Sequence, residues 1–237
     1  MRAGMLKRLI AYLTIAAVLF APLIVWLISV KNPVAYLIKD VPPGQALYIV
    51  SKLAGLFALC AFWGQCILAL AARAPVLREF PTVRQHQHKV IGLLTLVLVL
   101  THISLFFVAA SLRGGAPAWT LLWPNFSHGY YNAMVSLGLI AVWLLLLGVY
   151  AGWRTARGSR AWKKVHMIWF AVFLLVFIHA YAIGSESRYG AMRYVLLFIA
   201  TSLVAATLSR IGIRARAKWA VTGMVNSASA EKESGNS

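Results

Sequence analysis

Four histidines lie in apolar segments of this 237-residue chain. His88 and His102 are fourteen residues apart in one segment, and His166 and His179 are thirteen apart in another. At about 1.5 Å of rise per residue, each pair spans roughly 20 Å of helix, which fits two cofactors within one bilayer. A neutral imidazole is a good metal ligand, and an ionisable residue inside a membrane segment marks a functional site. The spacing predicts that these histidines are the axial ligands of two b-type haems.

Helix geometry decides whether the members of each pair share a face. Fourteen residues at about 100° each fall about 40° short of four turns, so His88 and His102 lie on the same face of the helix. Thirteen residues fall about 140° short of four turns. His166 and His179 therefore lie on the same face only if the helix is locally tightened or if His166 lies in an irregular first turn. The alternative is that each histidine only hydrogen-bonds to a neighbouring helix, which requires four packing roles at two matched depths.

The composition is that of a polytopic membrane protein. Hydrophobic residues make up 61% of the chain, charged residues 12%, and the mean hydropathy is +0.77, which leaves no room for a large soluble domain. The formal net charge is +18, but the basic residues stand at the ends of apolar runs, so we expect no nucleic-acid partner. Cys60 and Cys66 lie about 120° apart around one helix, which favours packing over a disulfide or a metal site.

The apolar segments predict an all-α integral membrane protein with a bundle of six transmembrane helices. Each segment is close to the about 20 residues that cross the hydrocarbon core. This haem-binding domain covers 1–213, and its expected spans are about 7–30, 46–72, 88–112, 133–153, 162–184 and 190–213. The first span is longer than a signal-peptide core, which favours a retained helix over a cleaved leader. The remainder, 214–237, has too few apolar residues to fold alone and is expected to be a disordered cytoplasmic tail.

Lysine and arginine predict the orientation of this bundle. They are concentrated at the amino terminus, after the second and fourth spans, and after the sixth span, whereas the intervening segments hold few. The positive-inside rule therefore places both termini in the cytoplasm. In this topology His88 and His166 lie near the cytoplasmic surface, and His102 and His179 lie nearer the outer one. The four histidines then form two pairs between helices, and each pair could hold one iron.

Three further residues are candidates for contact with the haems. Propionates are anionic, and Arg84 lies at the depth of the inner haem. Lys52 lies inside the outer end of the second span, where a charge is costly, which makes it the strongest candidate after the histidines. Phe173 lies midway between two of the histidines and could stand between the macrocycles, with core packing as the alternative. His86 and His128 are interpreted as interfacial or loop residues.

The four histidines on the third and fifth of six helices resemble the ferric reductase-like transmembrane domain superfamily, over about residues 46–213. This group includes NADPH oxidases, eukaryotic ferric reductases and the haem-binding membrane subunit of the bacterial periplasmic methionine sulfoxide reductase system. The resemblance implies two haem b groups, because the two-haem members use the same spacings of fourteen and thirteen residues. The location expected from it is a bacterial inner membrane, with lipid around the bundle.

The chain departs from this family in two respects. Oxidases and ferric reductases continue into a flavin and NADPH domain, whereas this chain has no G-x-G-x-x-G motif, so its electron donor is expected on another molecule. Family oxidases also place an arginine on the second helix and a histidine four residues after the outer ligand of the third. Lys52 and Phe106 take those places here, which argues against dedicated superoxide production.

The expected function is transmembrane electron transfer by a stand-alone two-haem cytochrome. Electrons would come from a cytoplasmic NAD(P)H-dependent flavin reductase that holds FAD or FMN, or from quinol, and would pass through the inner and then the outer haem. The acceptor would be extracytoplasmic, either ferric iron or a periplasmic redox protein. The chain would then be the membrane subunit of a ferric reductase-like oxidoreductase. The alternative is a non-redox haem carrier or small-solute transporter, and the spans contain no discontinuous-helix signal that would favour it.

Overall fold

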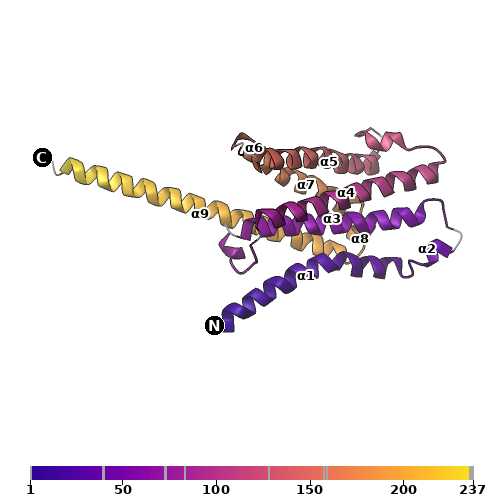
Figure 1. Ribbon diagram of the computed structural model, residues 1–237, viewed down its shortest axis with the longest axis horizontal. Coiled ribbons are helices and arrows are strands. Elements are labelled where there is room, and N and C mark those ends of the chain that lie inside the picture. The colour runs from indigo at the N-terminus through magenta and orange to yellow at the C-terminus, as the bar shows by residue number, and fades with distance from the viewer. Residues whose placement is uncertain are drawn as a thin grey trace.

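The computed structural model is a bundle of long helices (Figure 1). It describes residues 2–38, 41–71, 74–82, 84–127, 129–156, 158 and 160–234. The α-helices are α1 (Arg2–Val30), α2 (Ala35–Ile38), α3 (Gln45–Ala71), α4 (Gln85–Gly114), α5 (Gly129–Ala156), α6 (Arg160–Val165), α7 (Trp169–Ile183), α8 (Ser185–Arg188) and α9 (Met192–Ser234). Three 3₁₀ turns are also described: η1 (Pro75–Leu77), η2 (Trp119–Leu122) and η3 (His166–Ile168).

Six described segments are long and apolar enough to cross a membrane. They are Gly4–Val30, Gln45–Ala71, Gln85–Gly114, Gly129–Arg154, Arg160–Ile183 and Met192–Ile213. The all-helical bundle with six membrane-length helices agrees with the sequence-based expectation. The side of the membrane on which the termini lie stays a prediction. The disorder expected for 214–237 also stays a prediction, since it falls almost wholly on residues whose side chains are outside the described part of the chain.

Turn residues separate the spans where the sequence places them. Pro33 follows α1, and Pro42 and Pro43 precede α3, because proline lacks the N–H that a helix interior requires. α4 is capped at its carboxyl end by Gly115, whose φ of 68° is the left-handed conformation that glycine adopts without a steric cost. The end of α1, the start of α3 and the end of α4 therefore lie next to residues that oppose a longer helix.

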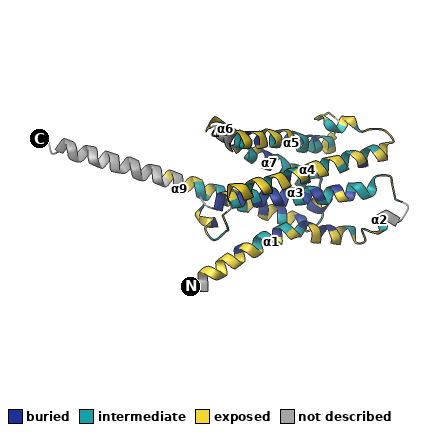
Figure 2. Ribbon diagram, viewed as in Figure 1, coloured by how far each residue is buried: buried dark blue, intermediate teal, exposed yellow. Residues whose placement is uncertain are grey.

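α3 is the central helix of the bundle. Its most apolar window is 67% buried, compared with 6% for that of α4, and Figure 2 shows buried residues concentrated along it. α3 packs against α1, α4 and α9, whereas α5 packs against α7. Two tryptophan indoles on these helices find polar partners: Trp63 donates to Ser202 Oγ and Trp26 to the Ile49 carbonyl, both at 2.9 Å. These bonds satisfy buried N–H groups that lipid could not.

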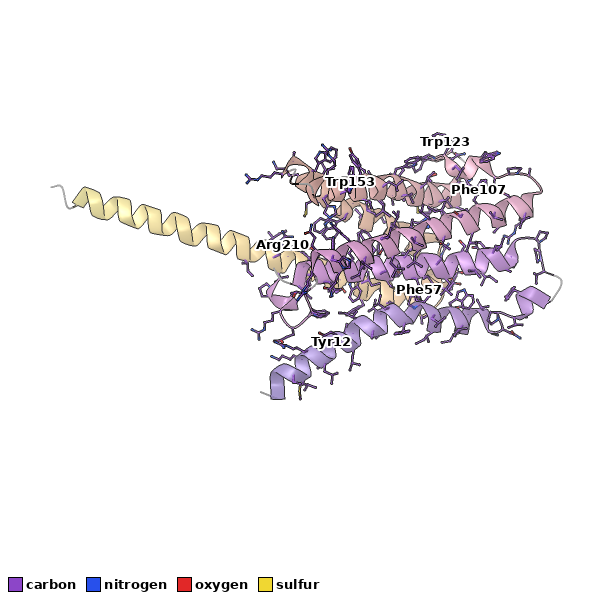
Figure 3. All side chains as sticks on the ribbon, in the orientation of Figure 1. Tyr12, Phe57, Phe107, Trp123, Trp153 and Arg210 are labelled. Carbon is purple, nitrogen blue, oxygen red and sulfur yellow. The ribbon has the colours of Figure 1, made fainter. Side chains whose placement is uncertain are left out.

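Aromatic residues mark both ends of the bundle. Trp123, in the segment before α5, and Trp153, near the end of α5, are 72% and 48% exposed, and Figure 3 shows them toward opposite ends of that helix. Exposed tryptophans at two levels are typical of the two membrane interfaces. Trp119 of η2 packs on Phe107 of α4 with ring centres 5.3 Å apart. The segment between α4 and α5 therefore folds back against α4 at η2.

Candidate functional site

The structure brings the four histidines together as two pairs between α4 and the α6–α7 segment. His102 faces His179, with ring centres 6.4 Å apart and ring planes at 71°. His88 faces His166, with ring centres 6.2 Å apart and ring planes at 81°. An imidazole nitrogen binds a metal ion at about 2 Å, so two imidazoles on opposite sides of one ion place their ring centres about 6 Å apart. Both pairs have the separation that a shared metal ion requires.

Each pair supplies two ligands and no more. Among the described residues, no group of three or more His, Cys, Asp or Glu side chains is placed to hold a metal ion. A metal ion held by one pair would therefore need its other ligands from a bound molecule. A planar macrocycle with its own nitrogen ligands fits between two facing imidazoles, and iron in a porphyrin is the common biological case.

A 3₁₀ turn brings His166 into register with His179. It is η3, which begins at His166 itself. Such a turn advances about 120° and about 2.0 Å per residue, compared with about 100° and about 1.5 Å in an α-helix. Thirteen residues that include three in 3₁₀ geometry therefore rise about 21 Å, as fourteen α-helical residues do, and rotate only about 40° less. The local tightening that the thirteen-residue spacing requires is present.

Backbone carbonyls orient three of the four imidazoles through Nδ1. The bonds are His102 to Ser51 (2.8 Å), His179 to Met134 (2.8 Å) and His166 to Gly148 (3.0 Å). A carbonyl oxygen only accepts, so Nδ1 carries the hydrogen in each case. The lone pair of the neutral ring is then on Nε2, which is free to bind a metal. A second hydrogen bond of this kind fixes the tautomer and orientation of metal-binding histidines.

Glycines on neighbouring helices make room for the same three rings. A Cβ atom at Gly138 would lie 2.8 Å from His179 Nδ1, and one at Gly55 would lie 3.0 Å from His102 Nδ1. A Cβ atom at Gly152 would lie 3.2 Å from the ring of His166. Sequence reasoning missed these glycines, although Gly138 and Gly152 are fourteen residues apart on α5 and so repeat the spacing of the ligands. This fourteen-residue repeat on α5 could have identified Gly138 and Gly152 from the sequence.

His88 is held differently, by the side chain of Gln65. Gln65 Nε2 lies 3.4 Å from both the Nε2 atom and the carbonyl oxygen of His88. Ser51 occupies the matching position at the other pair: its Oγ lies 3.1 Å from His102 Nδ1 and donates to the His102 carbonyl at 2.9 Å. Ser51 and Gln65 are fourteen residues apart on α3. The Nδ1 atom of His88 is buried without a hydrogen-bond partner, so this ring is the least restrained of the four.

Replacing Gln65 with leucine is expected to strengthen ligand binding at the His88 pair and to leave the His102 pair unchanged. The amide N–H of Gln65 lies 3.4 Å from His88 Nε2 and competes with a metal ion for the lone pair of that nitrogen, and hydrogen bonds of this kind contribute about 1 kcal/mol. Replacing Ser51 with alanine should act on the other pair, and only weakly, because the Ser51 carbonyl remains as acceptor. Spectra that resolve the two centres measure both effects. Weaker binding at the His88 pair in the Gln65 variant would contradict this assignment.

A cavity of about 180 Å³ surrounds the His102–His179 pair. Its wall is mainly apolar and comes from α3, α4, α5 and α7, and Leu121 of η2 and residues of α8 also line it. Lys52 also lies in this wall, so it lines the same cavity as His102 and His179, and its contact with a haem stays a prediction. Its ammonium already has a partner, since Nζ lies 2.6 Å from Oε1 of Glu186. Glu186 was not predicted as a site residue, because it belongs to no motif or periodic pattern in the sequence.

The other predicted residues lie outside these contacts. Arg84 is exposed and immediately precedes α4, at the same end of this helix as His88. Phe173 is 8% exposed and packs in the hydrophobic core against Phe62, with ring centres 6.1 Å apart. Phe62, and not Phe173, is among the residues that line the cavity. His86 is exposed in the first turn of α4.

Two sequence-based expectations concern residues away from the pairs. Cys60 and Cys66 are free thiols and both are buried, which confirms the packing interpretation. His128 lies outside the described residues, so its interpretation as a loop residue stays a prediction.

Comparison with known proteins identifies no relative: no family model, curated protein or solved structure matches the chain. The functional argument therefore rests on the two histidine pairs and on what surrounds them.

Proposed function

We propose that this chain is a two-haem b-type cytochrome that carries electrons across a membrane, as a stand-alone relative of the ferric reductase-like transmembrane domain superfamily. The observation that carries the proposal is the presence of two facing histidine pairs, 6.2 and 6.4 Å between ring centres, inside a bundle with six membrane-length helices. Two isolated packing contacts would not need equal separations between ring centres at two depths. Two sets of axial ligands to the same kind of metal centre would need them.

The surroundings of the pairs fit a haem. Facing imidazoles provide the axial ligands, and the hydrogen bonds at Nδ1 direct the Nε2 lone pairs of three of them. Gly55, Gly138 and Gly152 let the helices approach these rings closely. The mainly apolar cavity wall around His102 and His179 provides a low-dielectric surrounding. Bound haem would supply one-electron iron chemistry, and the protein would supply ligation, orientation and insulation.

The distribution of charge gives the proposed direction. The His88–His166 pair lies at the end where α4 begins, next to the basic segment that follows the second span, which the positive-inside rule assigns to the cytoplasm. We infer a cytoplasmic NAD(P)H-dependent flavin reductase, with FAD or FMN, as donor to this inner pair. The outer pair would then deliver electrons to ferric iron or a redox protein outside the membrane. A bacterial inner membrane suits this arrangement.

A reduced-minus-oxidised absorption spectrum of the purified protein is the primary test. We expect b-type haem bands and a haem content of about two per chain, because each facing pair binds one iron. Absence of the bands, or a content far below two, would refute the cytochrome and leave the transport alternative. In proteoliposomes with the protein inserted in one orientation, an added flavin reductase should reduce the haems only from the side that carries the basic loops.

A further inference from the structure

An ion pair is built into the wall of the cavity around His102 and His179. Lys52 of α3 and Glu186 of α8 form it, with side-chain exposures of only 21% and 5%. Ser185 Oγ closes the arrangement, since it accepts from Lys52 Nζ at 2.7 Å and donates to Glu186 Oε2 at 2.9 Å. Both carboxylate oxygens of Glu186 are therefore engaged, and one of them holds the ammonium directly.

This pair differs from the other ion pairs described. Those pairs join Glu79 to Arg8 and to Arg78, at 3.8 and 3.4 Å, and their arginine side chains are 74% and 72% exposed. Such exposed pairs are screened by water and contribute little. In the Lys52–Glu186 pair the carboxylate is buried and the ammonium is largely shielded, so these charges act over a longer range because the local dielectric constant is lower.

Stability alone does not account for a buried pair of this kind. Desolvation of two charges offsets most of their attraction, and apolar residues of similar volume are often as stable. Lys52 could instead serve as the partner of an anionic propionate, as its position in the sequence suggests. In the structure, however, its charge is already cancelled by Glu186.

On the basis of the two-haem function proposed above, we propose that Glu186 holds the reduction potential of the outer haem low by cancelling the positive charge of Lys52. Reduction of ferric to ferrous iron adds one electron between His102 and His179. An uncompensated ammonium nearby favours the reduced state, and an uncompensated carboxylate opposes it. With both charges present, their effects nearly cancel, so the outer haem stays reducing enough to pass its electron onward.

Coulomb's law gives the size of the expected effect. One unit charge at about 10 Å, with an effective dielectric constant of about 20, changes the equilibrium between the oxidised and reduced states by roughly tenfold. For a one-electron couple, a tenfold change corresponds to about 59 mV. A shift of this size is readily resolved in a redox titration.

The test is a double-mutant cycle read by spectroelectrochemical titration of both haems in the full-length protein. Glu186→Gln should raise the reduction potential of the outer haem by about 59 mV, which is a tenfold change in the equilibrium between its oxidised and reduced states. Lys52→Met should lower it by a similar amount. The double variant should return close to the wild-type value, and the inner haem should not move. Glu79→Gln, which removes an acid from the exposed pairs, is the matched control and should shift neither haem.

Other results would contradict the proposal or favour another role for Lys52. Shifts of equal sign in the two single variants, or no shift, would overturn the proposal. Selective loss of the outer haem in Lys52→Met would identify Lys52 as a propionate ligand instead. If Glu186→Gln does not fold, Glu186→Asp, which moves the charge away from Lys52, should give a smaller rise of the same sign, and its absence would overturn the proposal. Wild-type protein without haem would refute the proposed function itself.

Discussion

Replacement of His102 by alanine is expected to lower the haem content of the purified protein from about two to about one per chain. The variant removes one imidazole of the outer pair and leaves His179 alone, whereas the inner pair at 6.2 Å is untouched. A haem with one axial ligand is held far more weakly than one with two. Haem content per chain, together with optical and EPR spectra that distinguish the two centres, measures the loss.

His86→Ala is the matched control for this prediction. His86 belongs to the same helix, α4, but is exposed in its first turn and faces no other histidine in the described contacts. We expect this variant to keep both haems. Loss of both haems to the same extent in the His102 variant would contradict the assignment of one haem to each end of the bundle.

Replacement of Gly138 by alanine is expected to disrupt the outer centre without removing any ligand. The new methyl group would lie 2.8 Å from His179 Nδ1 and 3.0 Å from its Cε1 atom. The ring must then shift, which strains its hydrogen bond to the Met134 carbonyl. Overpacking of this kind costs about 1–3 kcal/mol. We expect selective loss of the outer haem, measured as haem content, and a lower melting temperature.

Gly64→Ala separates this effect from a general effect of helix glycines. Gly64 is buried on α3, but a Cβ atom placed there would meet nothing within 4 Å. Alanine forms helices better than glycine by about 0.5–1 kcal/mol, so this variant should keep both haems and be as stable as wild type or slightly more so. Retention of both haems in the Gly138 variant would show that the ring of His179 does not need the space.

Local regularities in the sequence carry most of the architecture. Runs of about 20 apolar residues, separated by proline, glycine and basic residues, are sufficient to predict six membrane-length helices, because a bilayer imposes one element length on a chain. The spacing of the histidines, together with the common direction of the third and fifth spans, also predicts that His88 pairs with His166 and His102 with His179. The thirteen-residue spacing requires either a tightened helix or an irregular first turn at His166, and the structure has a 3₁₀ turn that begins there.

The chemical surroundings of the pairs depend on contacts between distant segments. The carbonyls of Ser51, Met134 and Gly148 are present in any helix, and only packing decides which of them receives a histidine N–H. Glu186 and Lys52 are far apart in the sequence and meet only because α8 packs near α3. The midway position of Phe173 leaves both contact with a cofactor and core packing open, and the structure shows it packed in the core against Phe62.

The sequence by itself therefore determined the six membrane-length helices and which histidines share a level, because both follow from the spacing along each span and from the alternating direction of successive spans. Only the tertiary structure decided what holds each imidazole and which charge stands beside it. Those features depend on how helices lie against one another, and helix periodicity specifies the face of a residue but not its neighbour across the interface. The cancellation of the Lys52 charge by Glu186 is the clearest instance.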